Sequence, residues 1–153
     1  MGSASDETTA DDSWGFSEQE RVAMRERAAE LRTQAGRGRG DKAAADEADV
    51  LSKIESMADP DRAIAARIHA IVTSSAPGLS PKLWYGQPAY ARKGKVVCFF
   101  RSGHDDGERY STFGFSPEAG LDDGGLWPTS FAVTALDDDA TNTVAALVEK
   151  AAG

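Results

Sequence analysis

The spacing of apolar and polar residues predicts helices in the first half of the chain. Residues 17–35 open with Ser-Glu-Gln-Glu, the Ser-x-x-Glu spacing of a capping box, and then carry many charges but few apolar residues, which predicts an exposed and lightly docked helix. Residues 42–58 place apolar side chains at the i, i+1, i+4 and i+7 positions of an amphipathic helix. A third helix should follow, with Asp59 as its N-cap and Pro60 at its first position.

From Pro81 onwards the pattern changes from a helical to a strand-like period. The segments with this pattern are residues 87–91, 95–101, 109–115 and 130–135. The three aspartates at 137–139 should form the N-terminal end of a last helix, where their negative charge meets the positive end of the helix dipole. Because successive strands with short connections pair antiparallel, the predicted fold class is α+β, an antiparallel meander sheet of about four strands packed against helices.

The order of these segments predicts one α+β domain with an N-terminal helical extension. Residues 1–13 are acidic, have almost no side chain to bury, and are expected to form a disordered tail. Residues 14–58 form the predicted helical extension, which a Gly-rich linker at 36–40 interrupts. A phosphate-binding loop or an RGG-like RNA contact is the alternative for this linker, but no strand precedes it and the chain as a whole is acidic. Residues 59–153 form the predicted domain.

The composition narrows the classes of partner. The chain has 153 residues, the size of one domain, and its 25 acidic against 17 basic residues give a formal net charge of −8. This negative charge disfavours binding to nucleic acid and to anionic membrane surfaces, because they repel it. A cationic or metal partner meets less electrostatic opposition. No stretch has the apolar pattern of a secretory signal or a membrane span, so we expect a cytoplasmic protein. The single Cys98 lies in an apolar run and is expected to be an inert core thiol.

An aromatic segment at residues 83–90, Leu-Trp-Tyr-Gly-Gln-Pro-Ala-Tyr, is the first candidate site. Its rings combine an apolar body with one polar atom, which suits the border between core and solvent. If they converge with the indole of Trp127 they form a ligand pocket, and Arg109 is available to pair with an anionic group. The alternative is that these rings only close the open end of the sheet. The predicted ligand-binding residues are Trp84, Tyr85, Gln87, Tyr90, Arg109 and Trp127.

An acidic hairpin tip at residues 104–108 is the second candidate site. It supplies one imidazole and three carboxylates, ligand types that suit iron, manganese or magnesium. The predicted metal-binding residues are His104, Asp105, Asp106 and Glu108. A solvated tip is the alternative, because adjacent carboxylates diverge in an extended loop.

Catalysis is not indicated, since the sequence shows no nucleophile with an evident base beside it and none of the familiar catalytic motifs.

Residues 63–152 resemble the YdhG-like family, a group of domains of unknown function. The resemblance rests on Trp-Tyr-Gly-Gln-Pro-Ala-Tyr at 84–90, Arg-Tyr-Ser-Thr-Phe-Gly-Phe at 109–115, and Leu-Asp-Asp-Gly followed by Trp-Pro within 121–128. It implies a compact α+β fold. Some members carry the label of a frataxin-like iron chaperone, which implies weak binding of Fe2+ and its transfer to iron–sulfur assembly proteins. The family pattern more often has an apolar residue at Gln87, so the resemblance implies a more polar pocket here.

Two functions follow as hypotheses. The first is a non-enzymatic, cytoplasmic binding protein of the YdhG-like family that handles iron through surface carboxylates. The second is a small-ligand or protein-interaction module built on the aromatic segment. An enzyme is the least favoured class, because the sequence announces no catalytic chemistry.

Overall fold

The computed structural model describes residues 15–153, so the tail predicted for residues 1–13 lies outside the described part. The helices are α2 (Glu18–Ala35), α3 (Arg39–Ser56), α4 (Asp61–Ser75) and α5 (Asp138–Ala152). The strands are β1 (Ser80–Trp84), β2 (Gln87–Arg92), β3 (Lys95–Arg101), β4 (Ser111–Phe115) and β5 (Ser130–Val133). They form one antiparallel sheet in the order β1-β2-β3-β4-β5, which confirms the predicted α+β meander.

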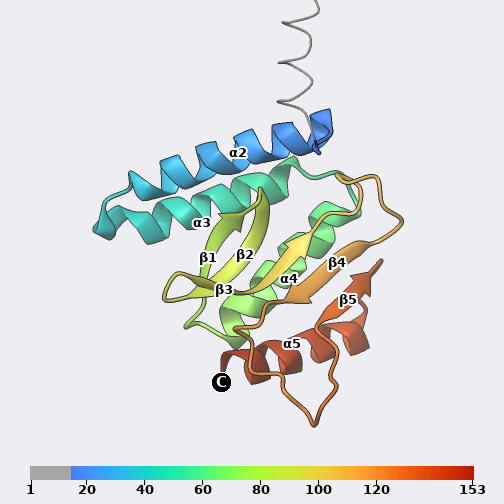
Figure 1. The fold of residues 1–153 in the computed structure, drawn as a ribbon. Coiled ribbons are helices and arrows are strands. Elements are labelled where there is room, and N and C mark those ends of the chain that lie inside the picture. The colour runs from blue at the N-terminus through green and yellow to red at the C-terminus, as the bar shows by residue number, and fades with distance from the viewer. Residues whose placement is uncertain (1–14) are drawn as a thin grey trace, which may run out of the picture.

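The core lies between the sheet and the helices. Figure 1 shows α4 running behind the sheet, with α2 and α3 as an antiparallel pair near β1 and β2. The β3–β4 register places Phe100 opposite Phe113 and Cys98 opposite Phe115, and all four side chains are buried. Residues two apart on a strand share a face, so these four form one apolar surface. The helices contribute Val50, Ile54, Ile68, Val72, Val144 and Val148 to the same core.

The opposite face of the sheet carries an aromatic contact that fixes the end of β1. Phe99 is paired with Gly114 in the neighbouring strand, and a Cβ on Gly114 would lie only 2.5 Å from the Phe99 ring. The ring therefore lies directly on the glycine, where a side chain would exclude it. Trp84 packs against Phe99 with ring centroids 5.3 Å apart. This contact holds the residue that precedes the β1–β2 turn.

The strand at Ser80–Trp84 was not predicted, so the sheet has five strands rather than about four. Pro81 lies inside this strand, and proline is accepted there because β1 is an edge strand whose only partner is β2. The predicted strand at 109–115 begins instead at Ser111, because Arg109 and Tyr110 belong to the preceding loop.

The helix boundaries differ from the predicted ones at two turns. Helix α3 begins at Arg39, so the predicted linker at 36–40 is in fact a bend of three residues, 36–38. The N-cap of α4 is Pro60 rather than Asp59, and Asp61 is the first helical residue. The last helix begins as predicted, since the Asp137 side chain accepts a hydrogen bond from the Ala140 amide at 2.8 Å. None of the helices described between residues 15 and 153 is long and apolar enough to cross a membrane.

The burial of Cys98 predicts an unreactive thiol. The side chain is fully buried, and burial raises its pKa to about 12, so the thiolate that reacts with disulfide reagents is scarce at neutral pH. We expect the native protein to resist labelling by Ellman's reagent and the same protein in denaturant to release one equivalent of chromophore. Rapid stoichiometric labelling of the native protein would contradict the inert core assignment.

Candidate functional site

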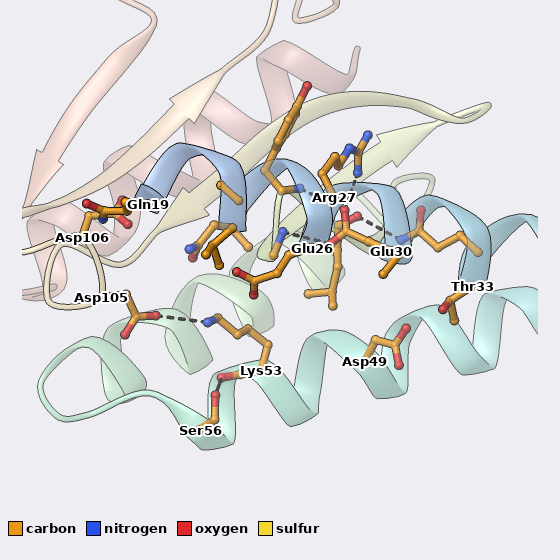
Figure 2. A pocket seen from close by; sticks show the side chains of 18 of the residues that line it. Gln19, Glu26, Arg27, Glu30, Thr33, Asp49, Lys53, Ser56, Asp105 and Asp106 are labelled. Carbon is orange, nitrogen blue, oxygen red and sulfur yellow. Dashed lines mark hydrogen bonds and ion pairs between the residues drawn. The ribbon is translucent and has the colours of Figure 1, made fainter. Parts of the chain in front are cut away.

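A cleft of 860 Å³ lies between α2 and the rest of the molecule. Its walls come from four parts of the chain, namely α2, α3, the turn between β1 and β2, and the loop between β3 and β4. Figure 2 shows Glu26 and Asp49 on the two facing helices, and Lys53 reaching from α3 to Asp105 in the loop. Lysine Nζ and aspartate Oδ2 are 3.1 Å apart in this ion pair. The cleft is therefore bordered by charged groups from several elements.

The β1–β2 turn presents Tyr85 to this cleft. Tyr85 and Gly86 both have positive φ, at 53° and 74°, which is what the two central residues of a type I′ hairpin turn require. Glycine adopts this conformation readily, whereas tyrosine rarely does. Glu30 of α2 holds the turn, because its carboxylate accepts the amides of Tyr85 at 3.1 Å and Gly86 at 2.9 Å. Tyr85 remains 62% exposed at the mouth of the cleft.

The guanidinium of Arg27 completes this junction. It lies 4.5 Å from the centroid of the Tyr85 ring, a cation–π contact, and it also pairs with the Glu30 carboxylate. Trp84 supports the other side of the turn, with its ring edge-on to Tyr85 at a centroid distance of 5.1 Å. Helix α2 and the end of β1 are thus joined by one tyrosine, one arginine and one glutamate.

Asp61, at the start of α4, holds the β3–β4 loop in place. Its buried carboxylate accepts the Ser102 hydroxyl at 2.6 Å and the His104 amide at 3.0 Å. Burial alone raises the pKa of Asp61, but the hydrogen bonds from Ser102, His104 and Ser111 outweigh it and leave the pKa below its usual range. The carboxylate is therefore ionised at neutral pH and fixes the loop that carries Asp105 towards the cleft.

The predicted metal ligands do not gather around one point. Asp105 pairs with Lys53, while Asp106 and Glu108 pair with the guanidinium of Arg101 at 3.0 and 2.8 Å. His104 is exposed, and its backbone amide is bound to Asp61. Within residues 15–153 no group of three or more His, Cys, Asp or Glu side chains is arranged to hold a metal ion. Iron binding by this loop stays a prediction.

Some of the predicted ligand-binding residues lie close to some of the predicted metal-binding residues. Tyr85 and Gln87 from the aromatic set and Asp105 and Asp106 from the acidic set line the same cleft. Gln87 also supports the loop, because its side-chain oxygen accepts the Ser102 amide at 3.4 Å. Both strands, β2 and β3, lie between the turn and the loop along the chain, and their antiparallel pairing brings the two to the same end of the sheet.

The remaining predicted ligand-binding residues lie elsewhere. Tyr90 is fully buried, burial raises its pKa, and its hydroxyl lies 2.9 Å from Nδ1 of His69. Trp127 lines a separate cavity of 450 Å³ beside the loop that joins β4 to β5. Arg109 lies over the ring of Tyr110 at 5.1 Å from the centroid. The four predicted rings therefore do not converge on one pocket.

Sequence reasoning missed the contribution of α2 and α3 to the site. Arg27 and Glu30, three positions apart in α2, form an ion pair within the helix, but Glu30 also binds the β1–β2 turn. No local pattern links residue 30 to residues 85 and 86, because the contact spans more than fifty positions. The acidic and basic residues of these helices gave no signal beyond an exposed helical surface.

Comparisons with protein-family models, with curated proteins and with solved structures found no match to the chain. The resemblance to the YdhG-like family therefore stays a prediction from the quoted motifs. What can be said of function rests on the cleft itself.

Proposed function

We propose that this protein is a binding protein whose ligand is a small cationic molecule in the cleft between α2 and α3. The observation that carries the proposal is the cleft of 860 Å³ into which four parts of the chain direct polar, charged and aromatic groups. This volume lies in the range of small-molecule sites. The exposed ring of Tyr85 at its mouth provides an aromatic surface for a cation.

The charge of the lining favours a cation. Five acidic and three basic side chains line the cleft. The three basic groups are paired with Glu30, Asp49 and Asp105 of the lining, and Asp106 pairs with Arg101. Among the described residues Glu26 is therefore the lining carboxylate left to meet a cation. The chain as a whole has a formal net charge of −8, which attracts cations and repels anions during association.

The lining supports binding rather than turnover. Among the cleft residues there is no histidine or cysteine, and the hydroxyl of Ser56 donates to the backbone oxygen of Lys53 at 2.6 Å instead of to a base. A nucleophile without an adjacent base is weak at neutral pH. The groups that face the cleft are therefore suited to hold a ligand by charge and aromatic contact.

Tyr85→Ala is expected to weaken ligand binding about tenfold, since a partly desolvated cation–π contact contributes about 1 to 2 kcal/mol. Ligands would first be found by thermal shift with a panel of amines, guanidines and carboxylic acids, because a ligand that binds only the native state raises the Tm. Calorimetry on the best amine then gives the affinity of each variant. Tyr110→Ala is the matched control, since Tyr110 is also an exposed tyrosine beneath an arginine but lies outside the cleft.

Two results would contradict the proposal. One is a panel in which no cationic compound shifts the Tm while carboxylic acids do. The other is an equal loss of affinity in Tyr85→Ala and Tyr110→Ala, which would place the binding site elsewhere.

Iron handling is the second candidate, favoured by the presence of Asp105 and Asp106 in the same cleft. The resemblance to the YdhG-like family implies this role, with iron–sulfur assembly proteins as partners. Anaerobic titration with Fe2+, followed by calorimetry, separates it from the first proposal. The double variant Asp105→Asn, Asp106→Asn should weaken the binding of Fe2+. Its affinity for the ligand that contacts Tyr85 should fall by a smaller factor. Binding no tighter than millimolar in the unsubstituted protein would exclude iron as the ligand.

A further inference from the structure

Helix α2 is attached to the sheet by polar contacts in its second half. The contacts are the Glu30 carboxylate with the amides of Tyr85 and Gly86, the Arg27 guanidinium over Tyr85, and the side-chain amide of Gln34 donating to the Leu83 carbonyl at 3.0 Å. Gln34 is the one buried residue of this helix. Attachment by a few hydrogen bonds differs from the apolar packing that holds the other helices.

The first half of α2 makes its polar contacts within itself. Ser17 and Glu20 form a capping box, and Glu18 pairs with Arg21. The apolar side chains of the helix are exposed rather than part of the core, as the exposed fractions of Met24 (45%) and Leu31 (47%) show. Detaching α2 would therefore expose little apolar surface that is not already in contact with water.

The bend between α2 and α3 has the properties of a hinge. It contains Gly36 and Gly38, and glycine accepts a wider range of backbone angles than any other residue. Arg37, between them, pairs with Asp46 and Asp49 of α3, so the far side of the bend is fixed to α3. The pivot is therefore Gly36, at the C-cap of α2, and rotation there breaks the hydrogen bond from the Arg37 amide to the Gln34 carbonyl at 3.3 Å.

We propose that α2 is a hinged cover, which swings about Gly36 as a unit and opens the cleft that it walls. Opening releases Glu30 from the β1–β2 turn and Arg27 from the Tyr85 ring, and it leaves the core of the sheet, α3, α4 and α5 intact. That this motion admits a ligand rests on the proposed function. The motion itself needs no ligand and is measured without one.

Amide hydrogen exchange tests the cover directly. Segments held by few buried contacts open at lower free energy than the core. Helices in proteins draw most of their stability from packing, so once α2 has swung away its own hydrogen bonds break more often and its amides exchange. We therefore expect the amides of α2 to exchange much faster than those of α3 in the unliganded protein. Equal protection of the two helices would overturn the proposal.

Glu30→Gln identifies the contact that closes the cover. The neutral side chain loses the charge-assisted bonds to the two turn amides, so the exchange of α2 should accelerate by about tenfold or more while that of α3 is unchanged. Glu26→Gln is the matched control, since Glu26 lies one turn earlier on the same face and lines the cleft. Equal acceleration in α2, α3 and the sheet would show general destabilisation and overturn the proposal.

Gly36→Ala tests the pivot. The added Cβ would meet the Arg32 carbonyl at 3.5 Å, an ordinary contact, so the closed state accepts it. The restricted backbone should slow α2 exchange a few-fold. Unchanged exchange would contradict the pivot.

The cover and the proposed function can fail independently. If α2 opens as expected but no cation binds, only the proposed function is contradicted. If a cation binds to a protein whose α2 does not open, only the cover is contradicted.

Discussion

Replacing Asp61 by alanine is expected to lower the free energy of unfolding by about 3 kcal/mol, because it leaves the buried donors of Ser102 and His104 without their charged acceptor. The loss should also release the β3–β4 loop that carries Asp105 to the cleft. Urea unfolding measures the change. Asp59→Ala is the control, since Asp59 is an exposed aspartate in an ion pair with Arg62 on the surface, and its loss should cost about 0.5 kcal/mol or less. Similar losses in the two variants would contradict the role assigned to Asp61.

The same carboxylate predicts a pH dependence of stability. The folded-state pKa of Asp61 is lowered, so its contribution is fully present above the pKa of the unfolded chain and is lost as the pH falls through the folded-state pKa. The stability difference between the unsubstituted protein and Asp61→Asn should be constant from neutral pH to about pH 5 and should shrink below about pH 4. A difference that stays constant throughout this range would show that the carboxylate charge is not what holds the loop.

Gly103→Ala is the second substitution with a large expected effect. A Cβ at this position would lie 2.2 Å from the backbone oxygen of Tyr110 and 2.5 Å from its carbonyl carbon. Backbone atoms cannot rotate away as a side chain can, so one side of the loop must move. We expect a loss of about 2 to 3 kcal/mol in the free energy of unfolding, at the upper end of overpacking effects.

Gly78→Ala provides the matched control for this substitution. A Cβ on Gly78 would meet nothing within 4 Å, so its effect on unfolding should be small. A displaced loop should also move Asp105 away from Lys53, so we expect Gly103→Ala to bind the proposed cationic ligand more weakly. Equal stability of the two variants would show that the loop accommodates the added methyl group.

Local patterns predicted most of the fold. The strand at Lys95–Arg101 and the aspartates at the start of the last helix lie where the sequence placed them, because period, charge and turn residues act over a few positions. The third helix was also expected, and α4 buries Ile64 and Ile68 at the four-residue spacing of one helix face. The strand β1 was missed because Pro81 interrupts its short pattern.

The site was harder to predict, because it depends on register and on distant contacts. Trp84 is opposite Gln87 across a two-residue turn, so Tyr90, three positions beyond Gln87, lies on the other face of the sheet. The two rings therefore separate although they are close in sequence. The contact of Glu30 with the turn joins segments more than fifty residues apart, and no residue spacing encodes it.

The position of Trp84 means that its intrinsic fluorescence can report on the cleft. The chain has three tryptophans, of which Trp84 is in edge-on contact with Tyr85 at the mouth of the cleft and Trp127 borders the separate 450 Å³ cavity. An indole at such a boundary emits at a wavelength set by the water around it. Replacing both Trp14 and Trp127 with phenylalanine would leave Trp84 as the one tryptophan, so that its emission reports on the mouth of the cleft and occupancy is read by titration without any attached dye.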